Sequence, residues 1–374
     1  MVDIFDLSRH LVNMEKFDIK STFAHRLRQA RTMAGLSLRE LSQQIGQAVS
    51  HAALAKYEKG EMMPDSSLLA KLCRALGQQP DFFLRAPTLE LGNVRFRKMA
   101  RLSSTLEKAI QEKALEHFEG YAEIEEILGL AKPFVNPLKS SLVRTMDDAE
   151  AQARELRKEW KLGHDPIPGV ISLLESNGVM IHEVDTNDHH IDGLCASTKA
   201  GPVIVIASWL NSNPLRKRMT TIHEVAHLLL KLPEGIEAKE EEKLVGRFAG
   251  AFLLPADSFR DQFGKHRSVI TLEELIQLKI FYGASIMSIM MRARHLDLIS
   301  EATYRRFWME CGCKWRQQHG EPGDDKYQVK EQPVRFKMLV YRAAAEQQIT
   351  LSKGAGLLKI PLGKFRDELK QVCS

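Results

Sequence analysis

Apolar residues recur at helical spacing along most of this chain, and glycines divide its first quarter into short helical segments. Each segment ends at or near a glycine, which readily takes the left-handed conformation that closes a helix. Ser37 is followed three residues later by Glu40, which predicts a capping box at the start of the second segment. The pattern therefore predicts a compact bundle of short helices at 23–33, 38–45, 51–58 and 65–76.

Beyond this bundle the apolar pattern predicts one small group of strands within an otherwise helical chain. A long helix is expected at 103–130, followed by helices at 147–161 and 166–176. Strands are expected at 179–184, 193–198 and 202–208, and the tight turn Ala200-Gly201-Pro202 favours a hairpin and an antiparallel sheet. The helices expected after Pro255 cover 272–282, 285–296, 301–313, 334–347, 351–358 and 362–372. The fold class is therefore mainly α with a small α+β domain.

The pentapeptide His-Glu-Val-Ala-His at 223–227 lies on a predicted helix that follows these strands. Positions i and i+4 share one helical face, so His223 and His227 can bind one Zn²⁺. Glu224 is then placed to accept a proton from the zinc-activated water, as a catalytic base. The pattern can also arise by chance, but the apolar spacing around it favours a real, buried helix.

A catalytic zinc site needs a third protein ligand, and the acidic run at 237–242 opens the next predicted helix. Glu242 stands near the start of the buried face of that helix, so we expect it to be the third metal ligand. Glu241 is the alternative ligand, and a solvated run of charges without a ligand is the other interpretation.

Charge is distributed unevenly along the chain, and the first third is the most basic part. The 374 residues are 44% hydrophobic and carry a net charge of +5, but residues 20–101 hold 14 Lys or Arg against 6 Asp or Glu. A basic small domain favours nucleic acid as its partner. No apolar run is long enough for a membrane span, and the N-terminus lacks a signal-peptide layout, so we expect a cytoplasmic protein. Five scattered cysteines predict reduced thiols, and Cys311-Gly312-Cys313 is only a weak metal motif.

The segments "GLSLRELSQQIG" and "LAKYEKGEMMPDSSLLAKLCRALG" resemble the Xre/Cro-type helix-turn-helix of bacterial and phage repressors. This resemblance implies a five-helix-type bundle that binds a double-stranded DNA operator as a homodimer. The link between Gly46 and Leu54 is two residues longer than the usual pattern. The DNA-contacting positions that the resemblance implies are Arg39, Gln47, Ser50, His51, Ala52 and Lys56. The segment 95–101 is either an extension of the backbone contact or a basic linker.

The segments "DPIPGVISLLESNGVMI", "IDGLCAS", "RMTTIHEVAHLLL" and "EKLVGRFAGAFLLP" resemble the ImmA/IrrE family of zinc metallopeptidases. That resemblance implies a zincin-like fold in which His223, His227 and Glu242 bind zinc and Glu224 is catalytic. Val245-Gly246 departs from the usual Ala-Asn of the family. The stretch Asp188-His189-His190 with Asp192 is either a second metal cluster or a polar loop, and its histidines could instead contribute to an oxyanion site. The expected domains are a 1–20 extension, a 21–85 DNA-binding domain, an 86–139 linker with a long helix, a 140–260 peptidase domain and a helical 261–374 region.

These observations favour a transcriptional regulator with a fused zinc endopeptidase domain, acting in stress response, prophage or toxin-antitoxin control. Its substrate is expected to be a partner repressor or this chain's own linker near 86–105. The alternative is a transcription factor or antitoxin whose peptidase-like domain senses or binds a protein partner, such as a toxin, without turnover. A third hypothesis is a housekeeping peptidase whose basic domain binds a protein.

Overall fold

A computed structural model of the protein describes residues 18–98, 103–138, 141–186, 191–317 and 320–373. The chain divides into two compact units, which are described separately. Unit 1 comprises Met1–Glu90, Leu102–Glu123 and Ala343–Ser374, and unit 2 comprises Leu91–Arg101 and Ile124–Arg342.

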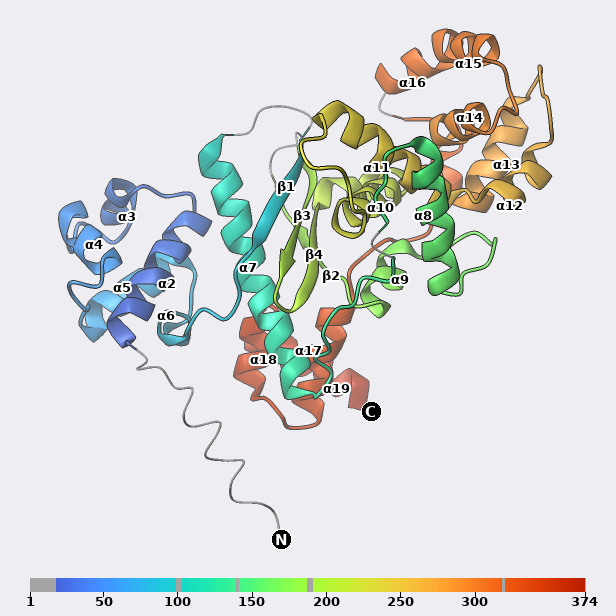
Figure 1. The fold of residues 1–374 in the computed structure, drawn as a ribbon. Coiled ribbons are helices and arrows are strands. Elements are labelled where there is room, and N and C mark those ends of the chain that lie inside the picture. Colours follow the sequence, from blue (N-terminus) through green and yellow to red (C-terminus); the bar gives the residue numbers. More distant parts are fainter. Residues whose placement is uncertain (1–17, 99–102, 139–140, 187–190, 318–319, 374) are drawn as a thin grey trace. The chain divides into compact units, whose positions relative to one another are not determined.

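The first part of unit 1 is a bundle of short helices, coloured blue in Figure 1. Ser37 and Glu40 form the expected capping box, and Gly77 ends α5 in the left-handed conformation. The bundle surrounds a core that includes Phe23, Leu54 and Leu72. Its helices are α2 (Ile19–Met33), α3 (Leu38–Gln44), α4 (His51–Glu58), α5 (Ser66–Leu76) and α6 (Pro80–Leu84).

A buried ion pair joins this bundle to the first part of α7 (Ser104–Ile127) within unit 1. Arg26 Nη1 donates to Glu119 Oε2 at 2.7 Å, and Arg26 also donates to the carbonyl oxygens of Arg85 and Ala86. Thr88 N donates to the second oxygen of Glu119 at 2.8 Å. These contacts satisfy the buried charges, as a folded interior requires. Unit 1 also contains α18 (Leu351–Leu357) and α19 (Leu362–Cys373).

Unit 2 is built around a four-stranded sheet in the order β1-β3-β4-β2. Its strands are β1 (Gly92–Lys98), β2 (Met180–Val184), β3 (Ile191–Thr198) and β4 (Gly201–Ala207). The expected hairpin is β3–β4, but β2 pairs in parallel with β4, so the sheet is mixed and the expectation of an antiparallel sheet was wrong. β4 is buried along its whole length because it has a strand on both sides.

Helices pack against this sheet and enclose the core of unit 2. α10 (Pro214–Leu229) contacts β3 and β4 and also α11 (Ala238–Leu253), which in turn contacts α8 (Met146–Glu159). α9 (Val170–Ser176) packs on β2 and α10. The remaining helices of this part are α12 (Ala256–Phe263), α13 (Leu272–Tyr282), α14 (Ile286–His295), α15 (Glu301–Phe307) and α16 (Cys313–Gln317), and α17 (Arg335–Ala345) begins here and continues into unit 1.

No single helix in the described ranges combines the length and apolar composition needed to cross a membrane. α13 and α14 satisfy that test only as a pair, with a bend of 94° between them. Burial of Leu275, Ile286 and Ile289 in the core cluster accounts for their apolar character.

Candidate metal centre

The helix that carries the His-Glu-Val-Ala-His motif, α10, is fixed at both its start and its middle. Asn213 caps it by accepting from Arg216 N, and Pro214 occupies the first helical turn. Arg218 is fully buried, and its Nη1 donates to Glu331 Oε1 at 2.5 Å. Such anchoring holds the helix face that carries His223 and His227 in one orientation.

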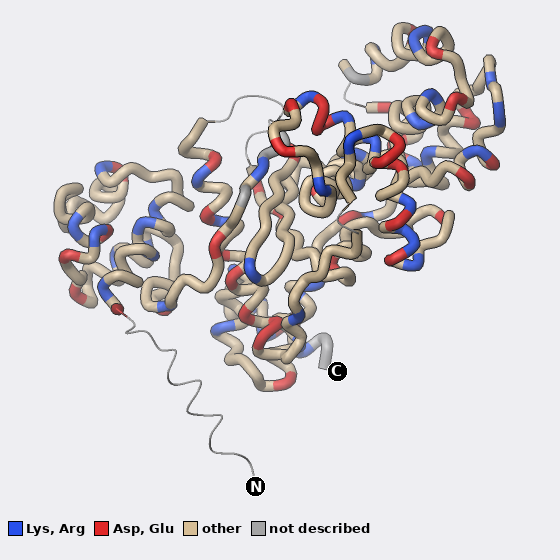
Figure 2. The backbone as a smooth tube through the Cα atoms, in the orientation of Figure 1, with Lys and Arg blue, Asp and Glu red and all other residues tan. Residues whose placement is uncertain are grey.

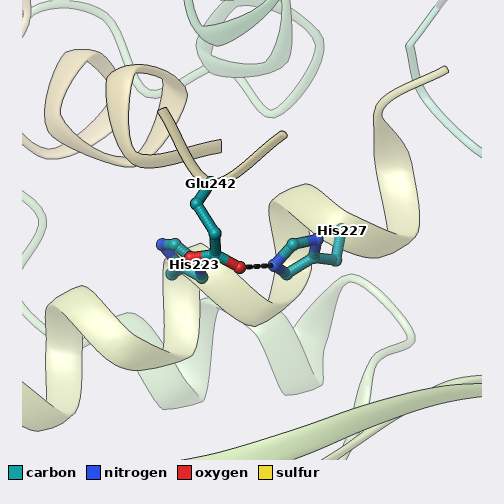
Figure 3. A group of neighbouring side chains, drawn as sticks. All are labelled: His223, His227 and Glu242. Atoms are coloured by element: carbon teal, nitrogen blue, oxygen red, sulfur yellow. Dashed lines mark ion pairs between the residues drawn. The ribbon is translucent and has the colours of Figure 1, made fainter. Parts of the chain in front are cut away.

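Glu242 comes from the second turn of α11 and lies over the two histidines of α10, as Figure 3 shows. Its Oε2 is 3.1 Å from His223 Nε2, and its Oε1 is 3.4 Å from His227 Nε2. One donor atom from each of these three side chains lies within 4.8 Å of the others. Across the described part of the chain, no other group of three or more His, Cys, Asp and Glu side chains has this geometry.

The donor set of this site fits a zinc ion. Two imidazole nitrogens and one carboxylate are the ligands of many catalytic zinc sites, which keep one further position open. The His223 side chain is 5% exposed, whereas the Glu242 side chain is 56% exposed, so the site opens to solvent on the α11 side. Hydrogen bonds from His223 and His227 hold the pKa of Glu242 well below its usual range, and Glu242 is therefore an anionic ligand candidate.

Glu241, the alternative third ligand, lies on the other side of His227. Its Oε1 is 3.0 Å from His227 Nδ1, away from the Nε2 atom that faces Glu242. A carboxylate in this position fixes the ring orientation and the tautomer of a metal-binding histidine. Arg95 of β1 forms an ion pair with the same Glu241 oxygen.

Glu224 faces β3 and is 1% exposed. The Cys195 thiol donates a hydrogen bond to Glu224, and burial together with the negative charge of Glu224 raises the pKa of Cys195. A Cβ atom built on Gly193 would lie 2.7 Å from Val205 O and 3.7 Å from Glu224 Cγ. Glycine at position 193 therefore permits the close approach of β3, β4 and the motif glutamate.

The six residues proposed to contact DNA are all exposed on unit 1. Arg39 lies in α3, and Gln47 takes a left-handed backbone conformation in the link between α3 and α4. Ser50 caps α4 by accepting from Ala53 N at 3.2 Å, so its hydroxyl already has a structural role. His51 and Ala52 begin α4, and Lys56 lies in its last turn. The assignment of these residues to DNA contact stays a prediction.

Two weaker sequence motifs have different outcomes. Asp188, His189 and His190 lie outside the described residues. Cys311 and Cys313 are free thiols, partly exposed and exposed respectively, and do not belong to the metal-ligand group described above.

Sequence reasoning missed the position of Arg95, because the segment around it was interpreted as linker or backbone contact. The structure places it in β1, which pairs with β3 beside the motif helix. The alternation Val94-Arg95-Phe96-Arg97 is the pattern of an edge strand, and that signal was present in the sequence.

Comparison with protein families identifies two regions of the chain. Residues 27–83 match the family described as helix-turn-helix, and residues 174–294 match the M78 peptidase family, described as IrrE N-terminal-like domain. These matches confirm the predicted fusion and support a DNA-binding regulator with a peptidase-family domain. No curated protein matches the chain.

Proposed function

We propose that this chain, with its helix-turn-helix and IrrE N-terminal-like domains, is a transcriptional regulator whose second domain is a zinc-dependent endopeptidase. The observation that carries the proposal is the convergence of His223, His227 and Glu242 on one point, next to the buried Glu224. The DNA target is an operator bound by a homodimer, and the protein acts in the cytoplasm. Its biological setting is stress response, prophage or toxin-antitoxin control.

In this proposal the side chains of His223, His227 and Glu242 would hold Zn²⁺. When bound, the ion would supply Lewis-acid chemistry for the attacking water and the scissile carbonyl. Glu224 accepts the proton of the attacking water and returns it to the leaving amine nitrogen. Glu241 accepts a hydrogen bond from His227 Nδ1–H, which leaves Nε2 free to bind the metal.

A partner repressor and this chain's own linker near 86–105 are the two substrates that the proposal allows. The linker is a substrate that can be tested directly, because Arg95 of β1 lies 3.4 Å from His227 Nδ1 and forms an ion pair with Glu241. A quenched fluorescent peptide covering 86–105, incubated with the zinc-loaded chain, measures hydrolysis. Mass spectrometry of the intact chain detects cleavage of the linker itself.

Glu224→Gln is the variant that tests catalysis. We expect it to retain zinc in elemental analysis and to lose hydrolysis by roughly 10²–10⁴-fold, because a proton-transfer group contributes about that factor. His223→Ala should lose zinc, whereas Glu240→Gln, a neighbouring partly exposed carboxylate, should keep both zinc and hydrolysis. Equal hydrolysis by Glu224→Gln and the parent chain would exclude the proposed mechanism.

The second candidate function is a transcription factor or antitoxin whose peptidase-like domain binds a partner without turnover. The position of β1 on the edge of β3 favours it, because β1 covers the edge with which an extended substrate peptide would pair. A reporter driven by the chain's own promoter separates the two. If Glu224→Gln binds zinc and regulates the reporter like the parent chain, proteolysis is not the function.

A further inference from the structure

The outer edge of the sheet beside the candidate metal centre is covered by a segment from the linker of the same chain. β1 runs antiparallel to β3, with Arg95 opposite Cys195, Phe96 opposite Leu194 and Arg97 opposite Gly193. β1 is the end strand of the sheet, and β3 is the strand next to it (Figure 1). Without β1, therefore, β3 would be the edge strand.

β3 is also the strand that approaches the candidate catalytic glutamate most closely. Gly193 and Cys195 both contact or approach Glu224, and α10 packs on β3. An extended peptide adds to a sheet by pairing its backbone with an exposed edge. A peptide that reached Glu224 in an extended conformation would use the edge of β3 that β1 covers.

Arg95 connects β1 to the metal centre itself. Because it stands opposite Cys195, its side chain emerges on the same sheet face as that thiol and Glu224. Arg95 Nη1 forms an ion pair with Glu241 Oε1 and lies 3.4 Å from His227 Nδ1. The guanidinium thus contacts the carboxylate that orients His227, next in sequence to Glu242.

The charges of the two segments are complementary. Residues 237–243 carry four Glu and two Lys, whereas β1 has three Arg or Lys residues and no acidic residue in its seven positions. Figure 2 shows the acidic positions at the start of α11. An extended peptide that presents a cation to Glu241 would gain from the same attraction.

The pairing of β1 with β3 is irregular near both ends of β1. The register of β1 on β3 shifts between Gly92 and Arg95 and again between Arg97 and Lys98. Each such irregularity interrupts the ladder of backbone hydrogen bonds. A regular peptide of the same length can therefore form more backbone hydrogen bonds with β3 than β1 does.

We propose that β1 is a built-in pseudosubstrate. It fills the site for an extended peptide along β3, it must leave before a substrate binds, and the substrate resembles it in placing an Arg or Lys side chain at Glu241. The inference rests on the proposed peptidase function for the identity of the site. Binding of a peptide can nevertheless be measured without turnover.

The test uses the full chain, zinc-loaded, in a Glu224→Gln background that prevents hydrolysis. A fluorescent synthetic peptide with the sequence of residues 90–99 is titrated with protein and followed by anisotropy. A tethered segment competes at an effective concentration on the order of millimolar, so the parent should bind the free peptide weakly. Arg95→Ala in the chain should strengthen binding by about two- to fivefold, because the competing segment loses a partly exposed ion pair.

Matched variants separate the role of Arg95 from general damage. Arg95→Lys keeps the positive charge and should bind the peptide as weakly as the parent. Arg305→Ala removes an exposed arginine elsewhere in unit 2 and should also match the parent. In the peptide, replacing the residue that corresponds to Arg95 by alanine should weaken binding to the Arg95→Ala chain. Adding Glu241→Gln to that chain should make the native and the alanine-containing peptides bind equally well. Faster hydrogen exchange of the β3 amides in Arg95→Ala reports the uncovered edge without any peptide.

The outcomes distinguish this inference from the proposed function. Equal peptide binding and equal β3 exchange in Arg95→Ala and the parent overturn the inference, whatever the hydrolysis assay shows. Stronger peptide binding and faster β3 exchange in Arg95→Ala support the inference even if no variant hydrolyses a peptide. If no hydrolysis is found, only the peptidase proposal fails. Cleavage of the parent chain within residues 92–98 makes β1 a substrate and overturns its inhibitory role.

Discussion

At the scale of single residues, helical phase gives two adjacent glutamates different positions around the histidines. Glu241 and Glu242 belong to one acidic run, and the sequence favoured Glu242 as the third ligand with Glu241 as the alternative. Successive residues on a helix point about 100° apart, so only one of them can face both Nε2 atoms. Glu242 takes that position, and Glu241 reaches Nδ1 of His227 instead. The choice depends on where α11 begins, which the residue pattern places only approximately.

Glu175 provides a residue-scale prediction about pH and stability. Its side chain is buried in α9 and accepts from Val334 N and Arg335 N at 3.3 Å, and burial raises its pKa to about 7. The native state therefore binds this proton more tightly than the unfolded state does. The resulting stability is fully present below about pH 4.5, and it is lost as pH rises through 7.

Glu175→Gln mimics the protonated carboxyl group at every pH. We expect the variant to exceed the parent in free energy of unfolding by roughly 1–3 kcal/mol at pH 8, with little difference at pH 5. Urea denaturation at the two pH values measures this. Glu159→Gln, at the exposed end of α8, is the control. A Glu175→Gln effect of the same size at both pH values would contradict the titration argument.

At the scale of elements, the sequence predicted the helices well because caps and glycines mark their ends locally. α4 and α13 have the predicted bounds, and α3 has the predicted capping box. Strand partners depend on contacts between distant segments, which local patterns do not encode. Hence the expected antiparallel direction of β2 was wrong, and β1 was missed. The unbroken apolar run of β4 did carry one usable signal, because a strand buried on both faces is typically central.

The capping box of α3 provides an element-scale prediction. Ser37→Ala removes the acceptor of Glu40 N, and we expect a loss of roughly 0.5–2 kcal/mol in the stability of that helix. Hydrogen exchange of the α3 amides, followed by mass spectrometry, measures the loss locally. Ser67→Ala, an exposed substitution inside α5, should leave the α3 exchange unchanged. If the α3 amides exchange at the same rate in Ser37→Ala and in the parent, the capping box does not contribute to the stability of α3.

At the scale of the whole molecule, the two matched families lie in separate stretches of the chain, so DNA binding can be tested apart from the candidate metal centre. Arg39→Ala and Lys56→Ala should each weaken binding to a duplex from the chain's own promoter by about tenfold. Each should also reduce the slope of log affinity against log salt by about one if the residue contacts phosphate. Anisotropy titrations between about 50 and 200 mM salt measure both quantities.

One control variant tests the specificity of the loss in DNA binding, and zinc content tests whether unit 2 is unaffected. Lys71→Ala, at an exposed position of α5, should bind the duplex like the parent. Zinc content should remain unchanged in all three variants, because the candidate metal ligands lie in unit 2. Duplex affinity that is the same in the parent, Arg39→Ala and Lys56→Ala would remove these residues from the DNA interface.

The buried Arg218–Glu331 pair limits how far this chain can be shortened to a fragment. Residues 174–294, the stretch that the peptidase family covers, exclude Glu331. A fragment with those ends would lose Glu331, the carbonyl oxygen of Ile167 and the ring of Tyr327, which all contact Arg218, and would open this buried guanidinium of the motif helix to solvent. An expression plasmid for the peptidase-family domain alone should therefore begin before Ile167 and extend past Glu331.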